Sequence, residues 1–134
     1  MLPEFGVRMI SILLVLLGGA IGSLCRYWWS GLVAARLGET FPYGTLFVNL
    51  VGCFIIGLAG GFLSKAAGAP WEQPMRIFLT VGVCGGLTTF SSFSLQTLNL
   101  IISKRWGAAL ANIVVSTTIC LVLVAAGWWL GETF

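Results

Sequence analysis

The stretch from Gly82 to Ser94, GVCGGLTTFSSFS, interrupts an apolar segment that runs from Ile77 to Ile102. That segment is long enough to cross the hydrocarbon core of a bilayer as a helix. The glycine pair Gly85-Gly86 and the β-branched threonines after it lower helix propensity near the expected midplane. Because an unpaired backbone N–H or C=O in hydrocarbon costs several kcal/mol, the predicted break must contact protein, line a cavity or hold an ion.

Hydroxyl side chains are concentrated after the glycine pair, where six fall within ten residues and are interleaved with Phe90 and Phe93. This composition is unfavourable for a surface that faces lipid. Hydroxyls in membrane helices also commonly bond back to their own helix, so a packing role stays open for each of them. The six are Thr88, Thr89, Ser91, Ser92, Ser94 and Thr97.

The composition places the chain among integral membrane proteins, with residues 1–134 forming a single domain. Of its 134 residues, 58% are hydrophobic and 8% are charged, and the mean hydropathy is +1.02. The seven basic residues form no run, so a nucleic-acid partner is not expected. The four cysteines form no C-x-x-C pair and histidine is absent, so we expect small buried thiols, no Cys/His metal site and no enzyme.

Four transmembrane helices are predicted, over residues 9–30, 43–64, 76–102 and 106–130, with the third broken near its middle. All four prolines and all four acidic residues fall between or outside these spans, where helix breakers and costly charges belong. The six tryptophans lie near the predicted span ends, as expected for indole at a membrane interface. The fold class is therefore an all-α, multi-pass membrane protein.

Basic residues are divided almost equally between the two ends of the predicted bundle. Because an excess of Lys and Arg on the cytoplasmic side sets orientation, this balance provides almost no bias. We expect dual topology, with chains inserted both ways and paired as antiparallel homodimers; a weak but single orientation is the alternative. One end carries Arg8, Lys65 and Arg76, and the other carries Arg36, Lys104 and Arg105, with Arg26 near that same end.

Glycines spaced by four residues occur in three of the spans. Each such pair lies on one helix face, where neighbouring backbones can approach closely, so we predict tight helix packing there. The pairs are Gly18 and Gly22, Gly57 and Gly61, and Gly82 and Gly86.

Polar residues inside the spans indicate the kind of solute that the helices could accommodate. Asn49 shares a helix face with Thr45, and Asn112 shares one with Ser116. Each amide has too many polar groups to satisfy locally, so we expect bonds across helices. No carboxylate or histidine lies in a predicted span, and the remaining donors are amides, hydroxyls and the electropositive edges of phenylalanine rings. This set favours an anion. Arg26 either snorkels to the interface or attracts anions to a vestibule.

Four stretches of this sequence resemble the CrcB family, the Fluc fluoride channels. They are GGAIGSLCRY (residues 18–27), PYGTLFVNLVG (42–52), GVCGGLTTFSSFS (82–94) and ALANIVVS (109–116). The resemblance implies an antiparallel, dual-topology homodimer in the cell (inner) membrane that passively exports fluoride through two narrow pores and so protects against fluoride toxicity. It also implies a structural sodium ion at the dimer centre.

The resemblance assigns roles to individual residues. Backbone carbonyls of Gly85 and Thr88 would hold the sodium ion, and Arg26 would lie near a vestibule. The residues expected along the fluoride pore are Asn49, Phe90, Phe93, Thr45, Ser91, Ser92 and Ser116, whereas the role of Asn112 is less defined.

Two other functions fit parts of the pattern. A small dual-topology multidrug exporter would share the short spans and balanced charge, but it would need a membrane-embedded carboxylate that the predicted spans lack. A non-transporting membrane assembly subunit would explain the glycine faces, but not the broken polar third span. We therefore expect a fluoride channel, with fluoride, membrane lipid and a second copy of the chain as its partners.

Overall fold

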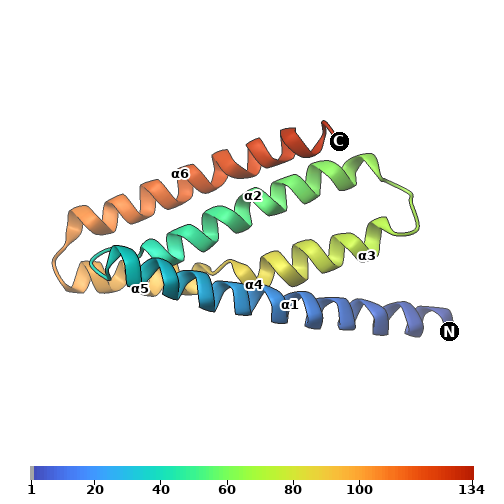
Figure 1. Cartoon of the computed structure of the whole chain (residues 1–134), viewed down its shortest axis with the longest axis horizontal. Coiled ribbons are helices and arrows are strands. Elements are labelled where there is room, and N and C mark those ends of the chain that lie inside the picture. Colours follow the sequence, from blue (N-terminus) through green and yellow to red (C-terminus); the bar gives the residue numbers. More distant parts are fainter. Residues whose placement is uncertain (1) are drawn as a thin grey trace.

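The computed structural model describes residues 2–134, and this part of the chain is all-helical with no strand. Three long helices, α1 (Leu2–Leu37), α2 (Tyr43–Lys65) and α6 (Trp106–Gly131), lie alongside a segmented third region (Figure 1). That region consists of α3 (Glu72–Arg76), the π-helix η1 (Ile77–Cys84), α4 (Gly85–Leu87) and α5 (Phe90–Ile102).

Four helical stretches are long and apolar enough to cross a membrane. They are Arg8–Leu37, Tyr43–Lys65, Glu72–Ile102 and Trp106–Gly131. The predicted number of spans is therefore confirmed, and the chain is a multi-pass membrane protein. The predicted limits of the second and fourth spans each lie within one residue of the observed ones.

The predicted end of the first helix was wrong, because α1 continues past Ser30 to Leu37. The intervening residues include no proline, so the sequence holds no strong reason for the helix to stop. It stops at Gly38, which has a φ of +81° and donates its N–H to the Ala34 carbonyl at 2.9 Å. This left-handed conformation after the last turn is typical of a glycine that ends a helix.

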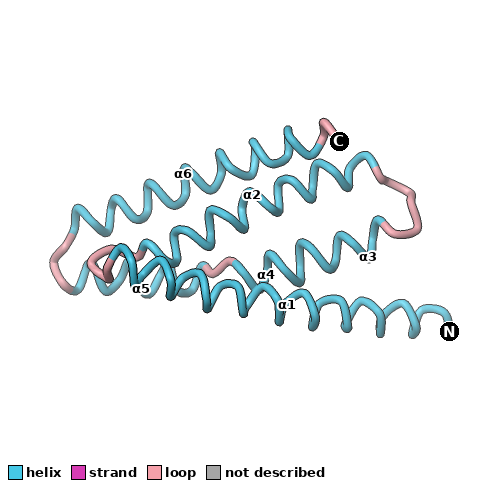
Figure 2. The backbone as a smooth tube through the Cα atoms, viewed as in Figure 1, coloured by secondary structure: helices cyan, strands magenta, loops and turns pink. Residues whose placement is uncertain are grey.

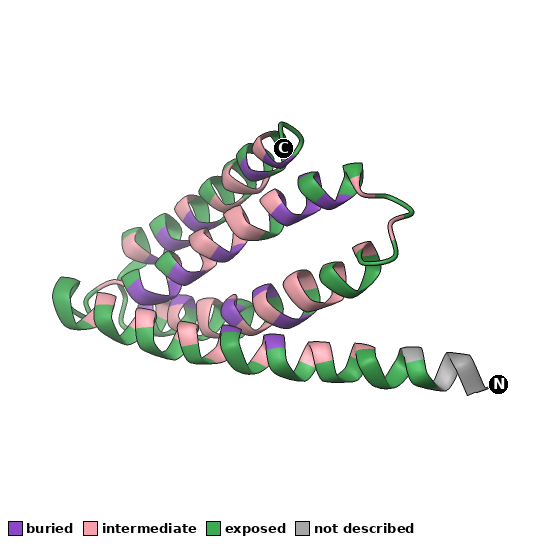
Figure 3. Ribbon diagram, turned by 45° about the vertical axis from the view of Figure 1, so that its right-hand side comes forward, coloured by how far each residue is buried: buried purple, intermediate pink, exposed green. Residues whose placement is uncertain are grey.

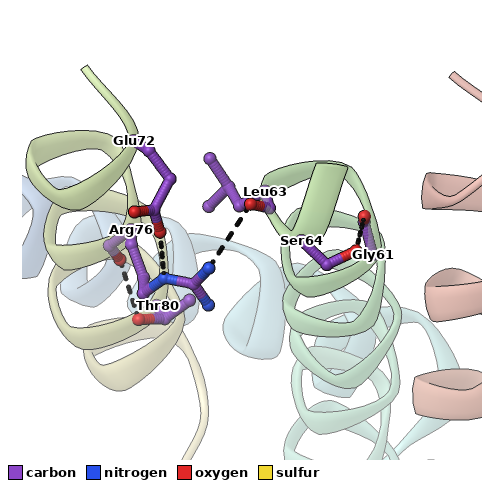
Figure 4. A network of polar contacts seen from close by, with 6 residues as sticks. All are labelled: Gly61, Leu63, Ser64, Glu72, Arg76 and Thr80. Carbon is purple, nitrogen blue, oxygen red and sulfur yellow. Dashed lines mark hydrogen bonds and ion pairs between the residues drawn. The ribbon is translucent and has the colours of Figure 1, made fainter. Parts of the chain in front are cut away.

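The third span also begins earlier than predicted, at Glu72 rather than Arg76, because Pro74 is tolerated in a first helical turn. Arg76 links the beginning of the third span to α2 by hydrogen bonding (Figure 4). Its Nε donates to Glu72 Oε1 at 2.6 Å and its Nη2 donates to the Leu63 carbonyl at 3.5 Å. An unpaired carbonyl near the end of α2 is thereby satisfied.

The glycine pairs lie at helix contacts, which confirms the predicted packing. A methyl group placed on Gly57 would lie 2.2 Å from the Val124 carbonyl oxygen, and one on Gly61 would lie 2.2 Å from that of Trp128. On the other side of the bundle, a methyl on Gly22 would lie 2.1 Å from the Val83 carbonyl oxygen. Side chains at these positions would force α2 away from α6, or α1 away from η1.

Buried residues are concentrated on the faces that α2 and α6 turn toward the rest of the bundle, and the outward side of α1 is largely exposed (Figure 3). Large apolar side chains such as Leu16, Leu24 and Trp28 are exposed along α1. A bundle in lipid can expose such side chains because hydrocarbon is as apolar as they are.

Candidate functional site

The helical path of the third span is interrupted at Thr88 and Thr89, which appear as a short loop between α4 and α5 (Figure 2). Both residues have extended backbones, with φ and ψ of −86° and 155° at Thr88 and of −151° and 111° at Thr89. The interruption was expected over the glycine pair and these two threonines; the glycine pair is itself helical. Gly86 is instead needed for packing, because a methyl on it would lie 2.6 Å from the Gly19 carbonyl oxygen.

The side-chain amide of Asn49 binds the interrupted backbone. The N–H of Thr89 donates to Asn49 Oδ1 at 2.8 Å, and Asn49 Nδ2 donates to the Thr89 carbonyl at 3.3 Å. Asn49 lies on α2, so the expected bond across helices is present. Because Nδ2 carries two hydrogens, a second donor remains beyond the one directed at Thr89.

The four backbone carbonyls of residues 85–88 lose their helical donors at the interruption, and two of them are those of Gly85 and Thr88. In a continuous α-helix the N–H of Thr89 would bond to the Gly85 carbonyl and that of Ser92 to the Thr88 carbonyl. Here the first donates to Asn49 and the second to the Thr89 hydroxyl, at 3.2 Å. These two carbonyls belong to the residues that the sequence resemblance assigned to sodium.

The Thr89 side chain begins α5 and connects the hydroxyls after it. As the N-cap residue it accepts the Ser92 N–H, which satisfies one of the free donors at the start of a helix. Its Oγ1 also lies 3.1 Å from the hydroxyls of both Ser91 and Ser92. Thr89 is buried, with 8% of its surface exposed. Its backbone and side chain together bond to Asn49, Ser91 and Ser92.

A cavity of about 290 Å³ lies beside the interruption, and we call it the Asn49 cavity. Phe90 and Phe93 line it with their ring centroids 5.4 Å apart and their planes at 40°. Thr88, Thr89, Ser116 and Thr117 supply hydroxyls around it. The remaining lining residues are Gly52, Cys53, Ile56, Cys84 and Cys120.

A second cavity, of about 470 Å³, is lined by Arg26, and we call it the Arg26 cavity. Its lining is more polar and includes the predicted residues Thr45, Ser91 and Ser92. Thr89 borders both cavities. The other lining residues are Ser23, Tyr27, Ser30, Val48 and Gln96.

The structure thus divides the predicted site residues between two cavities. Asn49, Phe90, Phe93, Ser116 and Thr88 line the first, and Arg26, Thr45, Ser91 and Ser92 line the second. Gly85 lines neither and is exposed.

Asn112 has a structural partner on another helix. Its Nδ2 donates to the Thr97 hydroxyl at 2.8 Å, and its Oδ1 accepts from Ser116 at 3.3 Å. It is 2% exposed, so it joins α6 to α5 inside the bundle. The expected bond across helices is therefore present for this amide too.

Two residues near the cavities were not singled out from the sequence. Thr89 was one hydroxyl among six, although its position three residues before Ser92 fits an N-cap. Gln96 was not considered; it borders the Arg26 cavity and a third cavity, of about 490 Å³, and its Oε1 is buried without a partner. No sequence signal marks Gln96, because its environment depends on how α5 packs.

Four membrane-crossing stretches, with two cavities beside an interrupted helix, define a multi-pass membrane protein. A family model described as CrcB-like protein, Camphor Resistance (CrcB), matches residues 13–128. The chain belongs to this family, which confirms the resemblance seen in the sequence.

Curated relatives match nearly the whole chain. A protein of Opitutus terrae named fluoride-specific ion channel FluC is 51% identical over 120 residues, covering 90% of this chain and 88% of the relative. FluC 4 of Brucella abortus is 46% identical and covers 87% of each chain. The FluC protein of Rhodospirillum rubrum is 45% identical and covers 92% of each chain.

Proposed function

We propose that this protein is a fluoride-selective ion channel that lets fluoride leave the cell passively and thereby protects against fluoride toxicity. One observation carries the proposal: relatives named fluoride-specific ion channels match about nine-tenths of the chain, at 45–51% identity. The chemistry of the two cavities agrees with it. Their lining offers hydroxyls, two amides and an arginine, and no carboxylate.

In this proposal the Arg26 cavity is the vestibule and the Asn49 cavity is part of the pore. The Arg26 guanidinium raises the local concentration of anions. Hydroxyls of Ser91 and Ser92 then replace part of the water bound to fluoride, and Thr89 lies between the two cavities. Beyond it, the second N–H of Asn49, the Ser116 hydroxyl and the edges of Phe90 and Phe93 complete the set of donors.

The working unit is an antiparallel homodimer of dual topology in the cell (inner) membrane. Phe90, one of the two pore phenylalanines, is 77% exposed in the single chain, as expected of a side chain that a second copy covers. Gly85 is likewise exposed, next to the interruption. The near-equal division of basic residues allows the two copies to insert in opposite orientations.

A structural sodium ion fits the freed carbonyls. Hard cations prefer oxygen ligands, and the Gly85 and Thr88 carbonyls have lost their helical donors. A two-fold axis would bring both carbonyls from each copy to one ion, so four oxygens would surround it. The ion would satisfy backbone groups that lipid cannot.

The test is fluoride efflux from liposomes that contain the purified protein, followed with a fluoride electrode, with chloride efflux measured in parallel. We expect fast fluoride release and negligible chloride release. Protein-free liposomes control for leak. Correctly folded protein that releases no fluoride would overturn the channel proposal, and equal release of both anions would overturn the selectivity.

The phenylalanines distinguish a channel from an assembly subunit. Replacing Phe93 with isoleucine removes the ring edge but keeps an apolar side chain, so fluoride flux should fall while the dimer still forms. The oligomeric state in detergent, measured by light scattering, is the accompanying readout. Unchanged flux would remove Phe93 from the pore.

A further inference from the structure

Three of the four cysteines meet on the wall of the Asn49 cavity. Cys53 comes from α2, Cys84 from η1 and Cys120 from α6, and all three line this cavity. Cys25, on α1, does not line it. The sequence shows only one thiol in each apolar segment, so this cluster is formed by the tertiary structure.

The contact between α2 and α6 places two of these thiols opposite each other. Gly61 packs on the Trp128 backbone, and one turn earlier Gly57 packs on the backbone of Val124. These pairs share one register, so the preceding turn brings Cys53 to Cys120. Both thiols line the Asn49 cavity, as this register requires.

The same register continues to the pore residues. One further turn along both helices lie Asn49 and Ser116, which line the same cavity. The thiol pair is therefore one helical turn from the donors proposed to contact fluoride. A group bound between the thiols would lie on the wall of that cavity.

The number of thiols restricts the ligand. Within residues 8–134 no group of three or more His, Cys, Asp or Glu is arranged to hold a metal ion. Zinc, which requires four ligands in structural sites, is therefore not expected. A soft cation that accepts two thiolates remains. In an apolar setting a divalent ion is favoured, because two thiolates neutralise it completely.

We propose that Cys53 and Cys120 form a two-coordinate site for a soft divalent cation of the mercuric class, and that its occupancy obstructs the Asn49 cavity. Binding is an exchange without oxidation or reduction. With mercuric chloride, two S–H bonds and two mercury–chlorine bonds break and two mercury–sulfur bonds form. Two protons and two chloride ions pass to solvent, which leaves a neutral dithiolate complex. Mercuric chloride is uncharged and can reach a thiol within the membrane.

The test of binding uses mercuric chloride and purified full-length protein in detergent. Cys25→Ser serves as the background, so that only the three cavity thiols remain. Titration is followed by the ultraviolet absorbance of mercury–thiolate bonds and by intact mass. We expect one tightly bound mercuric ion per chain, and loss of that ion in Cys53→Ala and in Cys120→Ala.

Cys84→Ala is the matched control, because Cys84 lines the same cavity but lies on η1. It should keep the tight ion. The assignment to the Cys53–Cys120 pair would be overturned if Cys84→Ala lost the mercuric ion to the same extent. It would also be overturned if both Cys53→Ala and Cys120→Ala kept the ion. Circular dichroism of each variant shows whether lost binding reflects lost fold; Cys→Ser versions replace any alanine variant that does not fold.

The claim that bound mercury obstructs the Asn49 cavity rests on the proposed channel function, and fluoride efflux tests it separately from binding. Fluoride efflux should be lost when mercuric chloride is added to the Cys25→Ser background and restored by excess dithiothreitol. Mercury bound with unchanged efflux would overturn the obstruction and leave the channel standing. Protein that binds mercury but never conducts fluoride would overturn the channel function and leave the metal site standing.

Discussion

The side-chain amide of Asn49 is hydrogen-bonded to both polar groups of the Thr89 backbone, accepting its N–H at 2.8 Å and donating to its carbonyl at 3.3 Å. Asn49, on α2, thus replaces the helical acceptor of the Thr89 N–H. It also donates to the Thr89 carbonyl, which as the N-cap carbonyl accepts the first helical bond of α5 as well. The interruption persists in an apolar environment because its backbone groups have these partners.

Replacing Asn49 with leucine should both destabilise the protein and reduce fluoride flux. The Thr89 N–H would lose its acceptor, at a cost of about 1–3 kcal/mol for a buried group left unpaired. The cavity would also lose an amide donor. Fluoride efflux and thermal unfolding in detergent measure the two effects, with Ser64→Ala as a control far from the cavities. Wild-type values in both assays would show that the Asn49 amide is needed neither for stability nor for fluoride flux.

Thr89→Val should weaken the start of α5, whereas Thr89→Ser should not. Valine keeps the shape but removes the hydroxyl that accepts the Ser92 N–H. Loss of such a cap costs about 0.5–2 kcal/mol. Unfolding in increasing denaturant should show the difference, and fluoride efflux should fall with it. If the serine variant is as damaged as the valine variant, the methyl group is the important feature, and capping is not.

Gly57→Ala should strongly destabilise the contact between α2 and α6. The added methyl would lie 2.2 Å from the Val124 carbonyl oxygen, so one helix must move away. Overpacking of this kind costs about 1–3 kcal/mol or more. Gly107→Ala is the control, because nothing lies within 4 Å of a methyl there. Equal stability of the two variants would contradict the packing observed between α2 and α6.

Extra lysines should lock the chain in one orientation. Ala67→Lys with Thr133→Lys adds two charges at one end, and Thr40→Lys with Ser103→Lys adds two at the other; all four positions are exposed. If the dimer is antiparallel, each double variant alone should lose fluoride resistance in cells. Expressing both together should restore it. Full resistance from one locked variant would count against the antiparallel pair.

Removing sodium should destabilise the dimer. The ion is proposed to bind the carbonyls of Gly85 and Thr88, and a ligand bound only to the folded state raises stability with its concentration. The thermal unfolding temperature should therefore rise with the concentration of sodium chloride. N-methylglucamine chloride replaces sodium chloride to keep the ionic strength constant. Identical curves in the two salts would remove the sodium site.

The limits of the helices followed from the sequence where a strong signal exists. Pro42 and the charged pair Lys104-Arg105 bound the second and fourth spans closely. The end of α1 was missed because glycine at position 38, not a proline or a charge, stops the helix. The π-helical turns of η1 were also not foreseen, since no residue pattern in Ile77–Cys84 distinguishes them from ordinary helical turns.

Local composition by itself determined that the chain crosses the membrane four times and that tight packing occurs at glycines spaced by four, and it predicts a polar break in the third span. Such properties depend on transfer to hydrocarbon and on helical periodicity, which act on neighbouring residues. Only the tertiary structure decided that the interruption falls at Thr88 and Thr89, where Asn49 supplies the replacement bonds. It also brought Cys53 to Cys120, because contacts between residues 40 or more positions apart depend on the register of packed helices.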